Sequence, residues 1–194
     1  MKKLLIFLLL ISMTCTSCVS DYIYERWPRN IVFNYVKAVC GRPIGQYYVS
    51  WYWDDHGNYE RSFKWCYRSA EQGLCTAQFS LGYKYEFGNG VEIDIQKALY
   101  WYNLAVEQED PSALYRMGVL YQIGKYVPKD EEKGMSLIRR AAELGSEEAI
   151  DRLKAIEEWE KWEEWDKEHN NDDSLQPLEQ QTLIINILSY PEKS

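Results

Sequence analysis

The chain has 194 residues, with 30 acidic against 22 basic side chains and a formal net charge of −8. An acidic balance of this size repels nucleic acid and disfavours anionic lipid surfaces, so a nucleic-acid-binding role is excluded from the expected functions. The length fits one domain, which can be a single globule or an elongated array of repeats.

The first segment has the features of a secretory signal peptide. Lys2 and Lys3 form a positive start, and residues 4–11 are an unbroken apolar run that is too short to span a bilayer stably. Small and polar residues then lead to Cys18. Export is therefore predicted to remove residues 1–17, which lowers the net charge to −10.

The end of this segment resembles a bacterial lipoprotein signal, in which a cysteine is lipidated and becomes the new N-terminus. Ser17 is the small residue that this signal prefers before the cysteine, whereas Cys15 stands where it prefers Leu, Val or Ile. Cys15 is the alternative site, although Thr14 fits less well before it. The resemblance implies lipidation of Cys18, and Val19 after it implies transfer to the outer membrane, facing the periplasm.

Two elements are expected ahead of the main repeat. A mostly apolar helix is predicted from Ile31 to Val39, and Gly41 can terminate it. Residues 46–53 are aromatic and fit either a strand or a short helix, of which we favour the helix.

An internal repeat of 36 residues organises the middle of the chain. Residues 77–85 and 113–121 carry Ala, Gly and Tyr at matching positions. The same offset relates further pairs: Trp65 and Trp101, Gly88 and Gly124, Val91 and Val127, Asp94 and Asp130, while Gly73 and Gly145 lie two offsets apart. So many coincidences at one offset indicate a repeated structural unit.

The repeated residues suit a helical hairpin. Ala77, Leu81 and Tyr85 recur at four-residue steps and predict an apolar stripe on a first helix. Gly82 and Gly118 beside that stripe allow a neighbouring helix to approach closely. Gly88 and Gly124 suit the left-handed conformation that ends each first helix. Asn58, Asp94 and Asp130 suit the N-terminal cap of each second helix. One face of the second helix carries Ala98, Trp101, Tyr102 and Ala105.

Two motifs carry a resemblance to a known family. They are Leu81-Gly-x-x-Tyr-x-x-Gly-x-Gly-Val-x-x-Asp94 and Lys97-Ala98-x-x-Trp101-Tyr102-x-x-Ala105. They resemble the Sel1-like repeat, a branch of the tetratricopeptide-like helical hairpins. The second unit departs from this pattern at Tyr126, Gly134 and Leu137, where the family has Gly, Ala and Trp. The resemblance implies an all-α fold, namely a right-handed α-solenoid of antiparallel helical hairpins that binds proteins.

The predicted organisation has five segments: residues 1–17 as signal peptide, 18–28 as linker from the lipid anchor, 29–61 as capping helix and degenerate repeat, 62–153 as Sel1-like repeats, and 154–194 as capping helix and acidic, tryptophan-rich tail. Caps are expected because a hairpin repeat cannot bury its apolar face alone. A helix should run from Ala149 to about His169. A polar loop should follow at 170–176, and a short helix at 177–188 should fold back on the array.

No motif for catalysis or metal binding was found. The two histidines are far apart, and Asp54-Asp55-His56 fits a polar turn. Gly88-Asn89-Gly90 is not a phosphate loop, because it lacks a third glycine and follows a helix. We therefore expect no catalytic residue, metal, cofactor or small-molecule substrate.

Three cysteines, Cys40, Cys66 and Cys75, leave the disulfide pairing open. Cysteine-rich relatives of these repeats bridge the two helices of a hairpin and have been linked to β-lactam binding. Cys66 and Cys75 differ from that arrangement in spacing and phase. A cell-envelope hydrolase of this type is the alternative function, although no serine or cysteine constellation supports it.

A partner-binding surface is predicted on the side of the first helices opposite the packed stripe. Its residues are Phe79, Tyr83 and Glu86, with Tyr115, Val119 and Gln122 at the 36-residue offset. The alternative is that they contact the adjacent hairpin. Trp162, between Trp159 and Trp165, either packs on the last hairpin and the C-terminal segment or adds a strip for a partner protein or the membrane interface. The expected function is an envelope adaptor or an immunity factor against a toxic effector, and both roles stay open.

Overall fold

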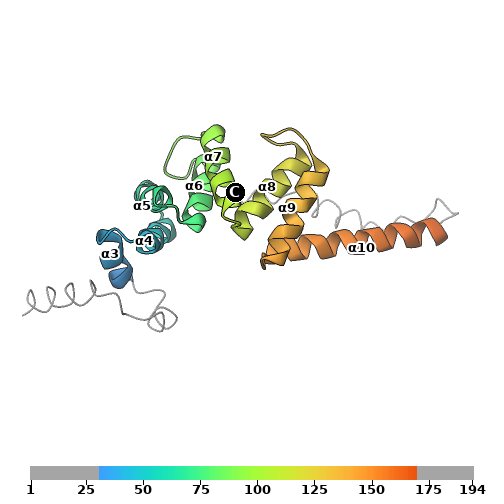
Figure 1. Cartoon of the computed structure of the whole chain (residues 1–194), viewed down its shortest axis with the longest axis horizontal. Helices are drawn as coiled ribbons and strands as arrows, with labels where there is room; N and C mark the ends of the chain where they lie inside the picture. The colour runs from blue at the N-terminus through green and yellow to red at the C-terminus, as the bar shows by residue number, and fades with distance from the viewer. Residues whose placement is uncertain (1–30, 170–194) are drawn as a thin grey trace, which may run out of the picture. The chain divides into compact units, whose positions relative to one another are not determined.

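Residues 31–169 of the protein are described by a computed structural model (Figure 1). Every regular element in that range is an α-helix, which confirms the all-α fold class. The chain divides into two compact units, Met1–Gln108 and Glu109–Ser194. The predicted signal peptide with Cys18, the linker and the helix at 177–188 lie outside the described residues.

Unit 1 is built from helices that each pack on the next one in the chain. They are α3 (Ile31–Val39), α4 (Pro43–Asp55), α5 (Tyr59–Glu71), α6 (Cys75–Phe87) and α7 (Ile95–Glu107). Helices α4 and α5 form one hairpin, and α6 and α7 form the next. The helix favoured for residues 46–53 is confirmed, and Pro43 in its first turn suits a helix start because no N–H is needed there.

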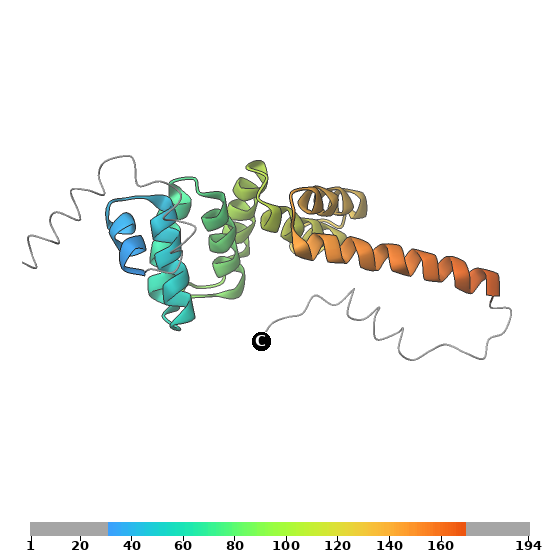
Figure 2. The ribbon, with the colours of Figure 1, turned by 90° about the horizontal axis from the view of Figure 1, so that it is seen from below.

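Unit 2 contains one further hairpin and a long helix. Its helices are α8 (Pro111–Ile123), α9 (Glu131–Glu143) and α10 (Glu147–His169). Helix α8 packs on α9, and α9 packs on α10. Helix α10 has 23 residues against 13 in α9, and Figure 2 shows it continuing well past the hairpin.

The second helices keep the 36-residue offset, because α5, α7 and α9 begin at Tyr59, Ile95 and Glu131. The first helices α6 and α8 keep it too, but α4 begins only 32 residues before α6. The loop at 56–58 is four residues shorter than the loop at 88–94, which accounts for the difference. The predicted segment boundaries after residues 61 and 153 fall inside α5 and α10, and the first hairpin already begins with α4 at Pro43.

The predicted helix caps are confirmed. Asn58, Asp94 and Asp130 each accept a hydrogen bond from the backbone N–H three residues later, at 3.2, 3.0 and 2.9 Å. The bond from the Lys97 backbone N–H is the main reason that the pKa of Asp94 is lowered, since it favours the charged carboxylate. Gly88 and Gly124 end their helices with φ of 75° and 69°. Glycine tolerates this left-handed conformation without strain.

The glycines inside the first helices sit at close helix contacts, as predicted. A Cβ at Gly82 would lie 2.7 Å from the ring of Tyr102 on α7. A Cβ at Gly118 would lie 2.8 Å from the carbonyl oxygen of Gly134 on α9, and one at Gly134 would lie 2.7 Å from that of Gly118. The family pattern has alanine at the position of Gly134. Glycine is needed here because the Cβ of an alanine would not fit between α8 and α9.

Tyr126 departs from the family pattern at a position that favours glycine. Its φ is 67°, and its counterpart Gly90 has a φ of 79°. A residue with a side chain loses roughly 1 kcal/mol or more in this region. In urea unfolding, we expect the free energy of unfolding of Tyr126→Gly to be about 1 kcal/mol higher than that of Tyr126→Ala, because alanine keeps the Cβ. Equal stability of the two variants would contradict the strain at this residue.

Candidate partner-binding surface

Helix α6 uses one side to form the core of its hairpin. Ala77, Leu81 and Tyr85 are buried there, as predicted. On α7 the predicted face is also buried: Ala98, Trp101, Tyr102 and Ala105. A partner must therefore contact the remaining sides of α6.

The prediction that Glu86 lies on the exposed side of α6 is wrong. Tyr102 lies across α6 at Gly82, where there is no side chain, and its hydroxyl donates a 2.8 Å hydrogen bond to Glu86 Oε2. Glu86 is only 4% exposed as a result. Phe79 joins the same cluster, since its ring centroid is 5.7 Å from that of Tyr102. Helical geometry alone could not anticipate a long side chain that crosses from α7.

Tyr83, predicted on the exposed side of α6, is half-buried. Its ring packs on that of Phe87, with centroids 4.4 Å apart. Phe87 is itself exposed, although the sequence pattern did not single it out. The spacing of four residues from Tyr83 was the signal that could have identified it, because such residues share a helix face.

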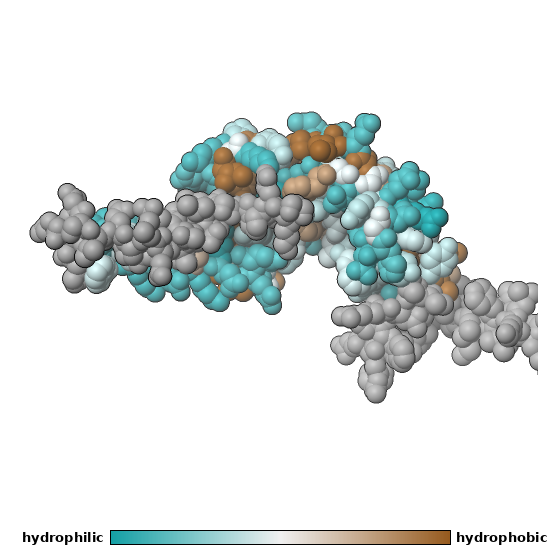
Figure 3. Space-filling model, turned by 180° about the vertical axis from the view of Figure 1, so that it is seen from behind, coloured by the Kyte–Doolittle hydropathy of each residue, from teal (hydrophilic) through white to brown (hydrophobic). Residues whose placement is uncertain are grey.

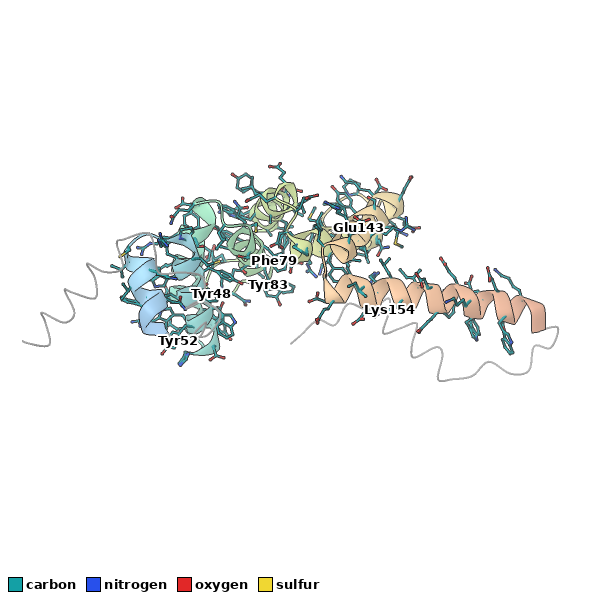
Figure 4. The ribbon with its side chains drawn as sticks, turned by 60° about the horizontal axis from the view of Figure 1, so that its bottom comes forward. Tyr48, Tyr52, Phe79, Tyr83, Glu143 and Lys154 are labelled. Atoms are coloured by element: carbon teal, nitrogen blue, oxygen red, sulfur yellow. The ribbon has the colours of Figure 1, made fainter. Side chains whose placement is uncertain are left out.

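Helix α4 adds aromatic side chains that the 36-residue offset missed. With the 32-residue offset of this hairpin, Trp51 is the counterpart of Tyr83, and it is 54% exposed. Tyr48, one turn earlier, is half-buried. Figure 4 shows Tyr48, Phe79 and Tyr83 on the same side of unit 1.

A partly buried ion pair joins α4 to α6. Lys84 Nζ lies 2.7 Å from both carboxylate oxygens of Asp54, and Lys84 is only 4% exposed. Asp54 thus has a structural role that the sequence, read as a polar turn, did not reveal. We group the exposed and half-buried aromatic residues of these two first helices as the first-helix face: Tyr48, Trp51, Tyr83 and Phe87.

Unit 2 does not repeat this aromatic surface. Tyr115 is half-buried, but Val119 is only 2% exposed, so its predicted place on a binding surface is wrong. Gln122 accepts a 2.8 Å hydrogen bond from Arg152 Nη2 on α10, which commits it to holding that helix. Ile123, the counterpart of Phe87, is exposed. In Figure 3 hydrophobic patches on the visible face are small and separated by hydrophilic residues.

Trp162 lies on α10 in a short aromatic cluster. Its ring centroid is 4.9 Å from that of Trp159, whose Nε1 donates a 3.0 Å hydrogen bond to Glu163. Trp165 is 53% exposed. These contacts run along α10 itself, and together with the exposure of Trp165 they favour a surface strip.

The three described cysteines are free thiols: Cys40 is exposed, Cys75 is half-buried and Cys66 is buried. Cys66 Sγ donates to the carbonyl oxygen of Ala77 at 3.4 Å, and burial raises its pKa to about 12. A thiol in this environment is a poor nucleophile, so Cys66 lends no support to a hydrolase. Between residues 31 and 169, no three potential metal ligands come together, and no helix is both long and apolar enough to cross a membrane.

The Sel1 repeat model matches residues 43–74, 76–110 and 111–146, which correspond to the three hairpins. A Sel1 repeat protein from Oxalobacter formigenes shares 27% identity, with a TM-score of 0.59, over 67% of this chain and 57% of that chain. A protective antigen of uropathogenic Escherichia coli strains, with an SLR fold, shares 28% identity, with a TM-score of 0.58, over 63% of this chain and 27% of that chain. These similarities confirm the predicted solenoid class of helical hairpins.

A similarity to a curated protein is confined to a short stretch. It is 45% identical over 49 residues to the chitin synthase regulator SKT5 of Saccharomyces cerevisiae. That stretch is 25% of this chain and 7% of the regulator, so this chain spans less than a tenth of its length. The similarity is therefore local and does not extend to the whole proteins.

Proposed function

The chain belongs to the Sel1 repeat family, and we propose that it is a non-enzymatic scaffold that binds a partner protein in the bacterial cell envelope. The observation that supports this most is the first-helix face. Trp51 and Phe87 are exposed there, and neither belongs to the buried core of its hairpin. Aromatic side chains of this kind contribute much of the energy of protein interfaces. The partner is either another envelope protein, for which the chain is an adaptor, or a toxic effector that it neutralises.

The proposal includes an N-terminal lipid anchor at Cys18, supported by the signal pattern before it. Cys18→Ser should release the protein from membrane fractions and abolish labelling by a fatty-acid probe, because the thiol is the acceptor of the lipid. Cys15→Ser is the matched control and should change neither readout. Labelling that disappears only in the Cys15 variant would move the anchor, and a soluble unmutated protein would end this part of the proposal.

Site-specific photo-crosslinking tests the binding surface. A photoreactive phenylalanine analogue is placed at Trp51 of α4 or, as control, at Tyr100 of α7, and both native side chains are exposed. Crosslinking is performed in intact cells, and the envelopes are then solubilised in detergent. We expect one protein to be trapped at position 51 and not at position 100. Equal trapping at both positions, or substrate turnover by the purified protein alone, would contradict the proposal.

A further inference from the structure

The second half of α10, residues 157–167, follows the part of the helix that is anchored to the hairpin. Ala149 in the first turn is buried, and Arg152 reaches Gln122 of α8. A 23-residue helix is about 34 Å long, whereas the 13 residues of α9 span about 20 Å. Figures 1 and 2 both show α10 extending past α9. Tryptophan is an unusual choice for such a projecting helix, because its large apolar ring is normally covered.

The tryptophans share one face of α10 with carboxylates. At about 100° per residue, three tryptophans and three acidic residues fall within about 160° of the helix circumference. We call them the tryptophan face; in order around the helix they are Trp165, Glu158, Trp162, Asp166, Trp159 and Glu163. The two lysines of this segment, Lys161 and Lys167, fall outside that arc, and Lys167 Nζ lies 3.8 Å from Oε2 of Glu163 at its edge. The face therefore combines indole rings with negative charge.

We propose that the tryptophan face binds a cationic segment of a partner protein, rich in lysine or arginine. Indole is the best aromatic ring for a cation stacked within about 6 Å, and an arginine guanidinium can also stack flat on it while donating to carboxylates. The acidic residues on the same face supply the complementary charge and hold the cation near the indoles. This surface lies in unit 2 and does not depend on the first-helix face.

Charge argues against the other occupants of this face. The chain's own residues 170–194 carry four acidic side chains and one lysine, so they lack the positive charge that would complement the carboxylates of α10. A second copy of the chain has a net charge of −8 and is therefore repelled. An anionic lipid surface is disfavoured for the same reason, although tryptophan alone would suit a membrane interface.

Binding of labelled nona-arginine to the full-length protein in detergent, followed by fluorescence anisotropy, tests the proposal. Nona-glutamate is the control peptide and should not bind. Trp162→Ala/Trp165→Ala leaves every charge in place and should weaken nona-arginine binding about tenfold. Far-UV circular dichroism checks that α10 remains helical. No binding by the unmutated protein, or unchanged binding by this variant, would overturn the proposal.

Two matched charge variants separate the face from the general acidity of the helix. Glu158→Gln/Glu163→Gln removes two charges from the tryptophan face and should weaken binding about fivefold. Glu157→Gln/Glu164→Gln removes two charges from the opposite side and should change it less than about twofold. Equal losses of nona-arginine affinity in the two charge variants would overturn the proposal. A rise of about tenfold in this affinity after deletion of residues 170–194 would also overturn it, because that segment would then be the occupant of the face. Trp51→Ala/Phe87→Ala should leave nona-arginine binding unchanged, which separates this test from that of the first-helix face.

Discussion

Gly82→Val is expected to destabilise unit 1 by about 3 kcal/mol, because its Cβ has no space. That atom would lie 2.7 Å from the ring of Tyr102 and 3.1 Å from the carbonyl oxygen of Ala98. Tyr102 is fully buried and its hydroxyl is bound to Glu86, so the ring cannot move without breaking that hydrogen bond. A valine also restricts its own rotamers inside the helix. Urea unfolding of the full chain measures the loss.

Thr76→Val is the matched control for this change. Thr76 lies on the same helix and is exposed, so a β-branched valine there should alter stability by less than about 0.5 kcal/mol. Similar unfolding midpoints for the Gly82 and Thr76 variants would show that α6 and α7 do not depend on this close contact.

Asp54→Ala should cost about 2 kcal/mol, because it leaves the charge of Lys84 buried without its carboxylate. Lys84→Met should cost less. It removes the buried charge, and the Asp54 side chain, which is 32% exposed, can then be hydrated. The double variant Asp54→Ala/Lys84→Met should recover part of the loss seen with Asp54→Ala. A double-mutant cycle in urea measures these terms. If Asp54→Ala and Lys84→Met caused equally small losses of stability, and these losses were additive in the double variant, the ion pair would not be holding α4 beside α6.

The sequence predicted those features that depend on local backbone requirements. A cap at Asp94 or Asp130 and a left-handed glycine at Gly88 or Gly124 satisfy the ends of a single helix, so they recur at a constant offset. Gly82 could be interpreted in the same way, because a missing side chain beside an apolar stripe points to a close helix contact. The hairpin fold was therefore accessible from one sequence.

The binding surface was less accessible, since it depends on contacts between distant residues. Tyr102 from α7 covers Glu86. Lys84 is buried because its ammonium group pairs with Asp54, which lies 30 positions earlier in the chain. The aromatic residues of α4 were missed for another reason. The short loop at 56–58 shifts Trp51 out of the 36-residue register, so it could not be matched to Tyr83.

Partner capture by the variant Trp51→Ala/Phe87→Ala tests most directly whether the first-helix face binds a protein without being needed for the fold. The protein is used as bait in detergent-solubilised envelopes, and the thermal unfolding midpoint of each variant is measured in parallel. Tyr59→Ala/Tyr100→Ala, which removes two exposed tyrosines from the second helices, is the matched control. We predict that the first variant loses about tenfold or more of the captured partner with an unchanged midpoint, and that the control captures as much as the unmutated protein. Undiminished capture by Trp51→Ala/Phe87→Ala, or a midpoint that falls together with capture, would contradict the account.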